Sequence, residues 1–219
     1  MAIALFDLDR TLIDVNSASL WVKHEWRGGR LSTMDALRGA WWVMRYQMGH
    51  DAGMDEVYRE AVRRLAGEDE EEMAARTLQW FADDVVQHIR PGALAALDAH
   101  RAAGDRLVVA TSSSPYAARA ARDAWGLHDI IHTSFEVRDG KFTGEIDGFA
   151  YGDTKFDRAV EWAAREGEDL SQASFYTDSV TDLKLLENVA KPVAVNPDKP
   201  LRRIATARKW SVVDWGRAR

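Results

Sequence analysis

The sequence predicts an α/β fold, with helices covering a parallel sheet and a helical segment inserted after the first strand. Three observations predict it. Beyond Pro91-Gly92, short apolar runs alternate with helical segments, as in parallel sheets whose strands are joined by helices. The apolar, β-prone run Ile3–Phe6 has the character of another strand of that sheet. Between them, residues 16–88 show helical spacing of apolar residues and no strand alternation.

The inserted segment is expected to hold a series of helices. Ser32 or Thr33 is a candidate cap for a helix whose apolar residues recur at three- and four-residue spacing, namely Met34, Leu37, Trp41 and Met44 or Met48. Helices are also expected at Met54–Leu65 and Glu70–Val86, with Ala66-Gly67 as the stop between them. The segment is rich in tryptophan, and we expect most of these residues in its core: Trp21, Trp26, Trp41, Trp42 and Trp80.

The rest of the chain supplies the sheet. Strands are expected at Leu107–Thr111, Ser174–Thr177 and Pro192–Val195, and helices at Tyr116–Trp125, Phe156–Arg165 and Leu183–Val189. Asp139-Gly140 is a strong hairpin turn signal between two β-prone segments, and we expect an edge hairpin there without a catalytic group. Pro91-Gly92 marks a boundary, so the predicted organisation is a core of residues 1–15 and 89–219 and an inserted helical unit of residues 16–88.

Composition excludes several functional classes. The 219-residue chain contains no cysteine, which excludes disulfides, thiolate metal sites and a cysteine nucleophile. A net charge of −6 argues against a nucleic-acid partner, because such proteins usually carry a basic surface. No apolar stretch is long enough for a membrane span and the first residues do not resemble a signal peptide, so we expect a cytoplasmic protein.

Two carboxylates follow the first predicted strand. Asp7 and Asp9 are two residues apart, and side chains at that spacing on an extended chain point the same way. Such a pair ionises easily only beside a cation, and Mg²⁺ prefers oxygen ligands. One Asp could then attack an electrophile while the other handles a proton. The alternative is a helix start, because Thr11 or Asp14 could cap the helix that follows.

Groups suited to a phosphate follow two later elements. Ser112 lies just after the predicted strand ending at Thr111, where a hydroxyl and helix-start amides could hold phosphate oxygens. A plain serine cap before Pro115 is the alternative. Lys155 lies just before a predicted helix, where a cation faces the positive end of the helix dipole, so a negative partner is indicated; a solvated surface lysine is the alternative.

Asp178 and Asp182 complete the set of candidate site residues. Asp178 ends the strand Ser174–Thr177, and Asp182 lies four residues later in the first helical turn. Two acids at this spacing after a buried strand suit a divalent metal. Either could instead favour the helix N-terminus.

These motifs, in this order, resemble those of the haloacid dehalogenase-like (HAD) hydrolases, and with the helical insert and the hairpin they are similar to the phosphoserine phosphatase-like members. The resemblance covers most of the chain. It implies a Rossmann-like core with an inserted helical cap, and a Mg²⁺-dependent phosphatase that acts on a small phosphomonoester.

The resemblance also implies a role for each motif. Asp7 would attack phosphorus and form an aspartyl phosphate, and Asp9 would act as acid and then base. Ser112, with Thr111 as the alternative, and Lys155 would hold the phosphate. Mg²⁺ would be held by Asp7, the backbone carbonyl of Asp9 and Asp178, with Asp182 steadying this arrangement. Many relatives carry Asn where this chain has Thr181.

The substrate is left open by the sequence. Phosphoserine phosphatases carry a Glu nine residues after the nucleophile to meet the substrate amine, and here that position is Asn16. We therefore expect Asn16 to bear on substrate specificity and phosphoserine not to be favoured. Phosphoserine or histidinol phosphate specifically, and a non-enzymatic binding role for the tryptophan-rich insert, are the alternatives.

Overall fold

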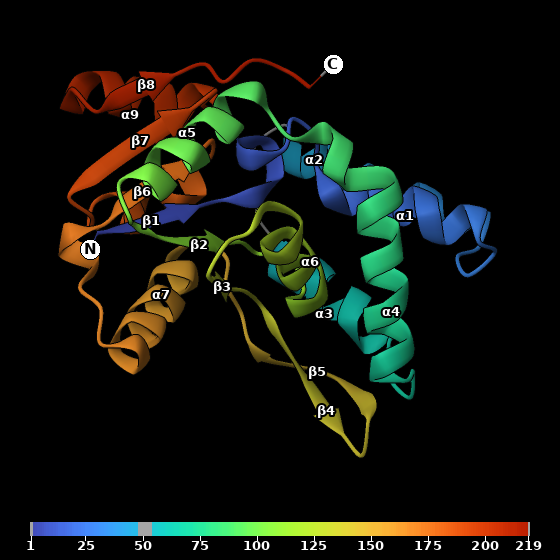
Figure 1. The fold of residues 1–219 in the computed structure, drawn as a ribbon. Helices are drawn as coiled ribbons and strands as arrows, with labels where there is room; N and C mark the ends of the chain where they lie inside the picture. The colour runs from blue at the N-terminus through green and yellow to red at the C-terminus, as the bar shows by residue number, and fades with distance from the viewer. Residues whose placement is uncertain (1, 48–53, 219) are drawn as a thin grey trace.

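The computed structural model describes residues 2–47 and 54–218. Its centre is a six-stranded sheet whose paired strands are all parallel, in the order β3-β2-β1-β6-β7-β8 (Figure 1). The strands, in that order, are Asp129–Ile131, Arg106–Ala110, Ile3–Phe6, Ser174–Thr177, Lys191–Val195 and Ser211–Val213. The first strand thus pairs with β2 and β6, which come from the far half of the sequence. The predicted α/β class is confirmed.

Each face of the sheet packs against its own helices because successive strand residues point to opposite faces. Ala4 and Phe6 belong to one apolar cluster, which includes residues of α5 (Pro91–Ala102) and α6 (Pro115–Trp125). Ile3 and Leu5 belong to the other, with residues of α7 (Asp153–Glu166), α8 (Leu183–Leu186) and α9 (Lys199–Arg208). Helices α5 and α7 lie on opposite faces in Figure 1. Burial on both faces explains why the central strands are continuous apolar runs.

The inserted helices lie together at the carboxyl end of the strands (Figure 1). They are α1 (Ser17–Arg27), α2 (Thr33–Gln47), α3 (Met54–Arg63) and α4 (Glu70–Trp80). The two ends of the insert meet, since Ile13 and Ile89 form an isolated antiparallel bridge. This meeting point agrees with the boundaries expected near residues 15 and 89, and we keep the division into core and inserted unit as a proposal.

The β-hairpin is placed differently from the prediction. Strands β4 (Ser134–Arg138) and β5 (Lys141–Gly148) form a separate two-stranded sheet instead of an edge of the main one. Asp139 and Gly140 both have positive φ, as the predicted turn requires. The hairpin is attached to the insert, because Gly67 N donates to Phe142 O at 2.8 Å and Glu70 N donates to Gly140 O at 2.9 Å.

The expectation that most tryptophans of the insert are core residues is wrong for two of them. Trp80 is 2% exposed and packs edge-on against Trp21, but Trp26 and Trp41 are 46% and 47% exposed. Met34 and Leu37 of α2 are exposed as well. Their three- and four-residue spacing therefore marks a helix, as predicted, but not a buried face. The side chains of Trp42 and Met44, and the whole of Met48, lie outside the described residues.

Among the described residues, none of the helices combines the length and apolar character that crossing a membrane requires.

Candidate active site

Strand β1 carries Asp7 to the carboxyl edge of the sheet. Asp7 N donates to Tyr176 O at 2.9 Å, which continues the pairing with β6. The chain then makes a tight turn, in which Leu12 N donates to Asp7 O at 3.2 Å. Arg10 in this turn has a φ of 60°, a left-handed conformation that is uncommon outside glycine. Asp9 lies close enough to Asp7 to raise the pKa of the Asp7 carboxyl. We call residues 7–15, which carry the candidate catalytic residues Asp7 and Asp9, the catalytic loop.

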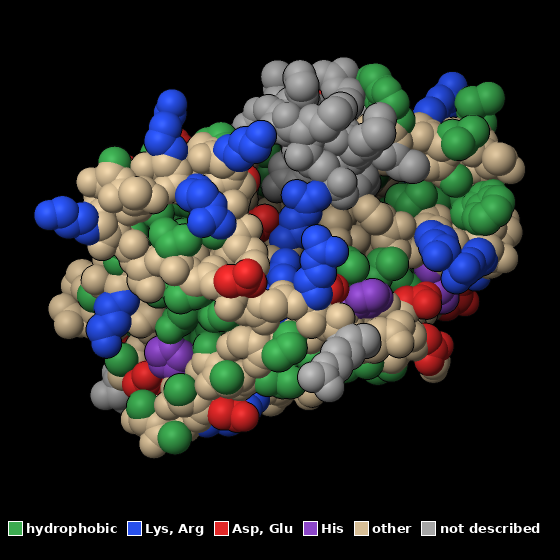
Figure 2. All heavy atoms as spheres, turned by 90° about the horizontal axis from the view of Figure 1, so that it is seen from above, with side chains coloured by type: hydrophobic (Ala, Val, Ile, Leu, Met, Phe, Trp, Pro, Cys, Tyr) green, Lys and Arg blue, Asp and Glu red, His purple; other side chains and the backbone are tan. Residues whose placement is uncertain are grey.

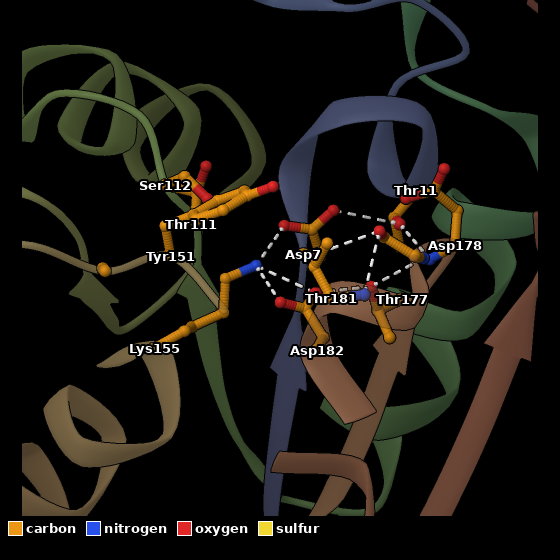
Figure 3. A network of polar contacts seen from close by, with 12 residues as sticks. Asp7, Thr11, Thr111, Ser112, Tyr151, Lys155, Thr177, Asp178, Thr181 and Asp182 are labelled. Carbon is orange, nitrogen blue, oxygen red and sulfur yellow. Dashed lines mark hydrogen bonds and ion pairs between the residues drawn. The ribbon is translucent and has the colours of Figure 1, made fainter. Parts of the chain in front are cut away.

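Both oxygens of the Asp7 carboxylate have partners (Figure 3). Lys155 Nζ donates to Asp7 Oδ1 at 3.0 Å, and Thr11 Oγ1 donates to Asp7 Oδ2 at 3.2 Å. Thr11 Oγ1 also accepts from Asp178 N at 3.0 Å. Thr11 therefore joins two acidic motifs and does not cap a helix. Helix α1 starts later, at Ser17.

Lys155 has the negative partner that its position at a helix start indicated. Its Nζ also donates to Asp182 Oδ2 at 2.9 Å, and Asp182 Oδ2 accepts from Thr177 Oγ1 at 2.7 Å. The side chain of Lys155 is 3% exposed, which excludes the solvated-lysine alternative. Helix α7 begins at Asp153, two residues earlier than Lys155, so Lys155 lies inside the first turn and not before it. Gly152 precedes the helix with a φ of 56°.

The carboxyl groups of Asp7, Asp9 and Asp178 are buried, and burial raises their pKa values. Burial raises the pKa of Asp7 to about 7, against the opposing effect of Lys155. Burial also raises the pKa of Asp9, and that of Asp178 well above its usual value. For Lys155, burial alone would lower the pKa, but Asp182 and Asp7 outweigh burial and raise it. Lys155 thus contacts two carboxylates, and at Asp178 the opposing charge of Arg10 does not outweigh burial and the neighbouring acids.

The donor set fits a hard divalent cation. No three His, Cys, Asp or Glu side chains within the described ranges converge as a complete metal cage. Mg²⁺ keeps several waters and usually takes only one or two protein carboxylates, so a full cage is not needed. Burial and the neighbouring Asp7 charge raise the pKa of the Asp178 carboxyl, and a bound cation would offset these effects.

The loop after β2 lies on the other side of Asp7 from Asp178 (Figure 3). Thr111 Oγ1 accepts from Ser113 N at 3.1 Å, and the Ser112 carbonyl accepts from Tyr58 Oη at 3.0 Å. Ser114 caps α6 by accepting from Ala117 N at 3.3 Å, with Pro115 as the first helical residue. The serine-cap alternative therefore holds for Ser114 and not for Ser112.

Asp9 and Asn16 connect the site to the inserted unit. Asp9 Oδ1 accepts from Ser17 N at 2.5 Å, so the start of α1 is held against the catalytic loop. Asn16 is the N-cap of α1, and its Oδ1 accepts from Ser19 N at 3.1 Å. Asn16, which we expect to bear on specificity, is therefore also the N-cap of α1. A substitution at Asn16 tests specificity only if the new residue can still cap the helix.

A polar hollow of about 780 Å³ lies beside the catalytic loop, and Asp178 forms part of its wall. Its lining also includes Arg10, Asp14, His88 and Arg217. Figure 2 looks onto the face formed by α5 and the C-terminal segment, where basic, acidic and histidine side chains lie side by side. Asp178 thus lines this hollow and is also close enough to Asp7 for the Asp7 charge to raise its pKa.

The chain is similar to known proteins over most of its length. Residues 4–187 match the model of the haloacid dehalogenase-like hydrolase family. The chain belongs to this family. It is 34% identical to the "Inhibition of morphological differentiation protein" of Streptomyces azureus, over 98% of this chain and 78% of the relative. It is 31% identical to the histidinol-phosphatase of Neisseria meningitidis serogroup C, over 97% of this chain and 98% of the relative.

A solved structure shares nearly the whole fold of this chain. A Bordetella pertussis protein of unknown function superposes with a TM-score of 0.88 at 32% identity, covering 98% of this chain and 99% of that chain. The predicted family resemblance is confirmed, and so are the Rossmann-like core and the helical insert.

Several polar residues of this HAD-like site escaped the sequence analysis. Thr177 holds Asp182, and Tyr58 reaches the Ser112 carbonyl from α3 of the insert. Figure 3 shows the Tyr151 ring beside Thr111 and Ser112. Thr177 directly precedes Asp178, so its place at a strand end was a usable signal. No local pattern marks Tyr58 or Tyr151, because both reach the site from segments without a motif.

Proposed function

We propose that the protein is a Mg²⁺-dependent phosphomonoester hydrolase that works through an aspartyl-phosphate intermediate. One observation carries the proposal: Asp7 is held on both oxygens, by Lys155 and Thr11, and faces the Ser112 loop across a space at the strand ends. A fixed carboxylate beside a buried cation and a hydroxyl-bearing loop suits attack on a phosphoryl group, whose charge spreads over several oxygens. Ser112 and Lys155 would hold those oxygens.

Asp9 suits the role of acid and base. Burial raises the pKa of Asp9, so at neutral pH its carboxyl group keeps a proton more readily than an exposed aspartate. In the first step this proton passes to the leaving alcohol as Asp7 binds phosphorus. In the second step Asp9 takes a proton from the water that hydrolyses the acyl phosphate. The hydrogen bond from Ser17 N fixes one oxygen of Asp9 and so its orientation.

The residues that would hold Mg²⁺ are Asp7, the backbone carbonyl of Asp9, and Asp178, with Asp182 keeping Lys155 in place beside them. When bound, the cation would neutralise the carboxylates and the phosphoryl charge, and it would align the two reacting groups.

We expect Mg²⁺ to stabilise the protein, and to do so more at about pH 8 than at about pH 5. Burial raises the pKa of Asp7 from 3.8 to about 7. Between these values the folded state holds a proton that the unfolded chain releases, so without metal the free energy of unfolding falls as pH rises. Metal binding displaces that proton, and free Mg²⁺ at 100 times its dissociation constant adds about 2.7 kcal/mol.

Thermal unfolding with Mg²⁺ and with EDTA, at both pH values, measures this effect. Asp178→Asn is the matched variant, because it keeps side-chain size but removes one proposed ligand, and it should show a smaller Mg²⁺ shift. An equal shift at both pH values would contradict the assignment of Asp7 as a ligand.

The substrate class follows from the uncharged residue at the start of the insert. Asn16 offers no carboxylate for a substrate amine, so we expect little preference for phosphoserine over a matched phosphate that lacks the amine. Histidinol phosphate is the second candidate, because the Neisseria histidinol-phosphatase matches over nearly its whole length. A panel of small phosphomonoesters with Mg²⁺, read as kcat/KM, decides among these.

We expect Asn16→Asp to shift preference toward amine-bearing phosphates, because it adds a negative charge and remains a good N-cap. Asn16→Glu adds the same charge but caps poorly, and it should lose about 1 kcal/mol of stability. The measurement is kcat/KM for phosphoserine against its amine-free counterpart. If the wild-type protein already prefers phosphoserine about 100-fold or more, roughly 3 kcal/mol, Asn16 does not set specificity.

The same screen separates catalysis from a binding role of the insert. Trp26 and Trp41 are exposed enough to contact a partner, so a non-enzymatic protein would bind through them without turnover. Release of phosphate from an aryl phosphate, dependent on Mg²⁺ and lost in Asp7→Asn, supports the hydrolase. Its absence across the whole panel would overturn the proposal.

A further inference from the structure

Arg90 is a buried arginine that joins the catalytic loop to the C-terminal segment. It stands just before Pro91 at the start of α5 and is 7% exposed. Its Nε donates to the carbonyl of Arg10 at 3.1 Å, and its Nη1 donates to the carbonyl of Gly216. Its backbone N donates to Leu12 O at 2.9 Å. The Arg90 side chain therefore links two segments that lie 80 and 126 residues from it in the sequence.

The carbonyl that Arg90 holds belongs to the strained part of the catalytic loop. Arg10 has a φ of 60°, and it directly follows Asp9. A non-glycine residue keeps such a conformation only where its surroundings enforce it. Rotation of the Arg10 backbone toward an ordinary conformation would turn the neighbouring Asp9. Asp7 would not follow, because its backbone N is held separately by Tyr176 O of strand β6.

The C-terminal segment gives Arg90 a rigid anchor. Trp215 is 8% exposed and packs so closely on Gly92 that a Cβ there would come within 2.5 Å of its ring. Trp215 O accepts from Gly92 N at 3.0 Å. Beyond it, Ala218 N donates to Asp14 Oδ2 at 2.9 Å, which reaches the end of the catalytic loop directly. Residues 215–218 thus form a fixed support behind the loop.

We propose that Arg90 is a positioning residue that sets the orientation of Asp9, with the C-terminal segment as its support; this rests on the proposed function, in which Asp9 is the acid. Arg90 contacts neither Asp7 nor Asp9. Its loss should therefore weaken proton donation more than attack by Asp7. Esters with poor leaving alcohols need the proton and those with activated phenols do not, so the two kinds of ester separate these effects.

The test compares Arg90→Met with Arg106→Met. Arg106 is a partly buried arginine with ion pairs to Asp129, Glu166 and Glu168, but it lies at the opposite end of β2 from the site. We expect Arg90→Met to lower the ratio of kcat/KM for an alkyl phosphate to kcat/KM for an aryl phosphate by about tenfold or more, because kcat/KM reports the step in which the alcohol leaves and general acid catalysis of that step is lost. Arg106→Met should leave this ratio unchanged. Arg90→Lys, which keeps a donor and a charge, should lie between wild type and Arg90→Met.

Amide hydrogen exchange supplies a readout that does not depend on activity. Arg90→Met should speed exchange at the amides of residues 8–15, and Arg106→Met should not. If the wild-type protein hydrolyses neither ester, the proposed function fails, while the exchange measurement still decides whether Arg90 holds the loop. An unchanged kcat/KM ratio with unchanged exchange, in a folded Arg90→Met protein, would overturn the inference.

Discussion

Replacing Asp7 with Asn is expected to abolish turnover while the protein stays folded. The substitution removes the proposed nucleophile but keeps the side-chain volume, and an Asn oxygen still accepts from Lys155, which retains its ion pair with Asp182. Loss of a covalent nucleophile should cost about four orders of magnitude in kcat or more. Stability should not fall, because the lost charge is one that burial makes costly to ionise.

Steady-state phosphate release and thermal unfolding test this expectation together. Asp157→Asn is a suitable control, since Asp157 of helix α7 makes an exposed ion pair with Lys184 of α8 and has no proposed part in the reaction. Residual activity of Asp7→Asn within about tenfold of wild type would exclude the covalent mechanism, because general acid catalysis alone could then account for the rate.

Replacing Asp9 with Asn is expected to affect substrates unequally. The kcat/KM for alkyl phosphates should fall by a factor of about 100 to 10,000, the usual contribution of a general acid. The kcat/KM for activated aryl phosphates, which reports only the first step, should fall far less. Asn keeps an oxygen that accepts from Ser17 N, so the start of α1 should stay in place.

Burst kinetics separate the two steps for Asp9→Asn. With an activated aryl phosphate, rapid release of the phenol should be followed by slow release of phosphate, because Asp9 also activates the hydrolytic water. Equal losses on alkyl and aryl esters, without a burst, would show that Asp9 is not the acid and base.

The sequence was most informative where the structure is most buried. Strands β1 and β6 have the predicted bounds because both are apolar runs covered on two faces. Strand β2 ends at Ala110, one residue before the predicted end, because Thr111 turns to accept from Ser113 N. The three-residue edge strands β3 and β8 escaped prediction, since so short a run carries no periodicity.

The site residues also divide into those that a local sequence pattern predicts and those that it does not. Asp7 and Asp178 directly follow predicted strands, so local pattern places them at the sheet edge. Lys155 was marked by its unfavourable position at a helix start, although its contact with Asp7 spans 148 residues. Arg90 was not marked at all, because its partners are backbone carbonyls, and any sequence supplies those. Exposure of Trp26 and Trp41 likewise depends on how helices pack, which their spacing does not reveal.

The central claim is that Asp7 becomes covalently phosphorylated. The most direct measurement is the intact mass of the protein after it is mixed with Mg²⁺ and an aryl phosphate and quenched in acid, which preserves an acyl phosphate. We predict a species heavier by one phosphoryl group, located on Asp7 by peptide mapping, enriched in Asp9→Asn and absent from Asp7→Asn. Rapid phosphate release with no such species in Asp9→Asn, or with the phosphoryl group on another residue, would contradict the account.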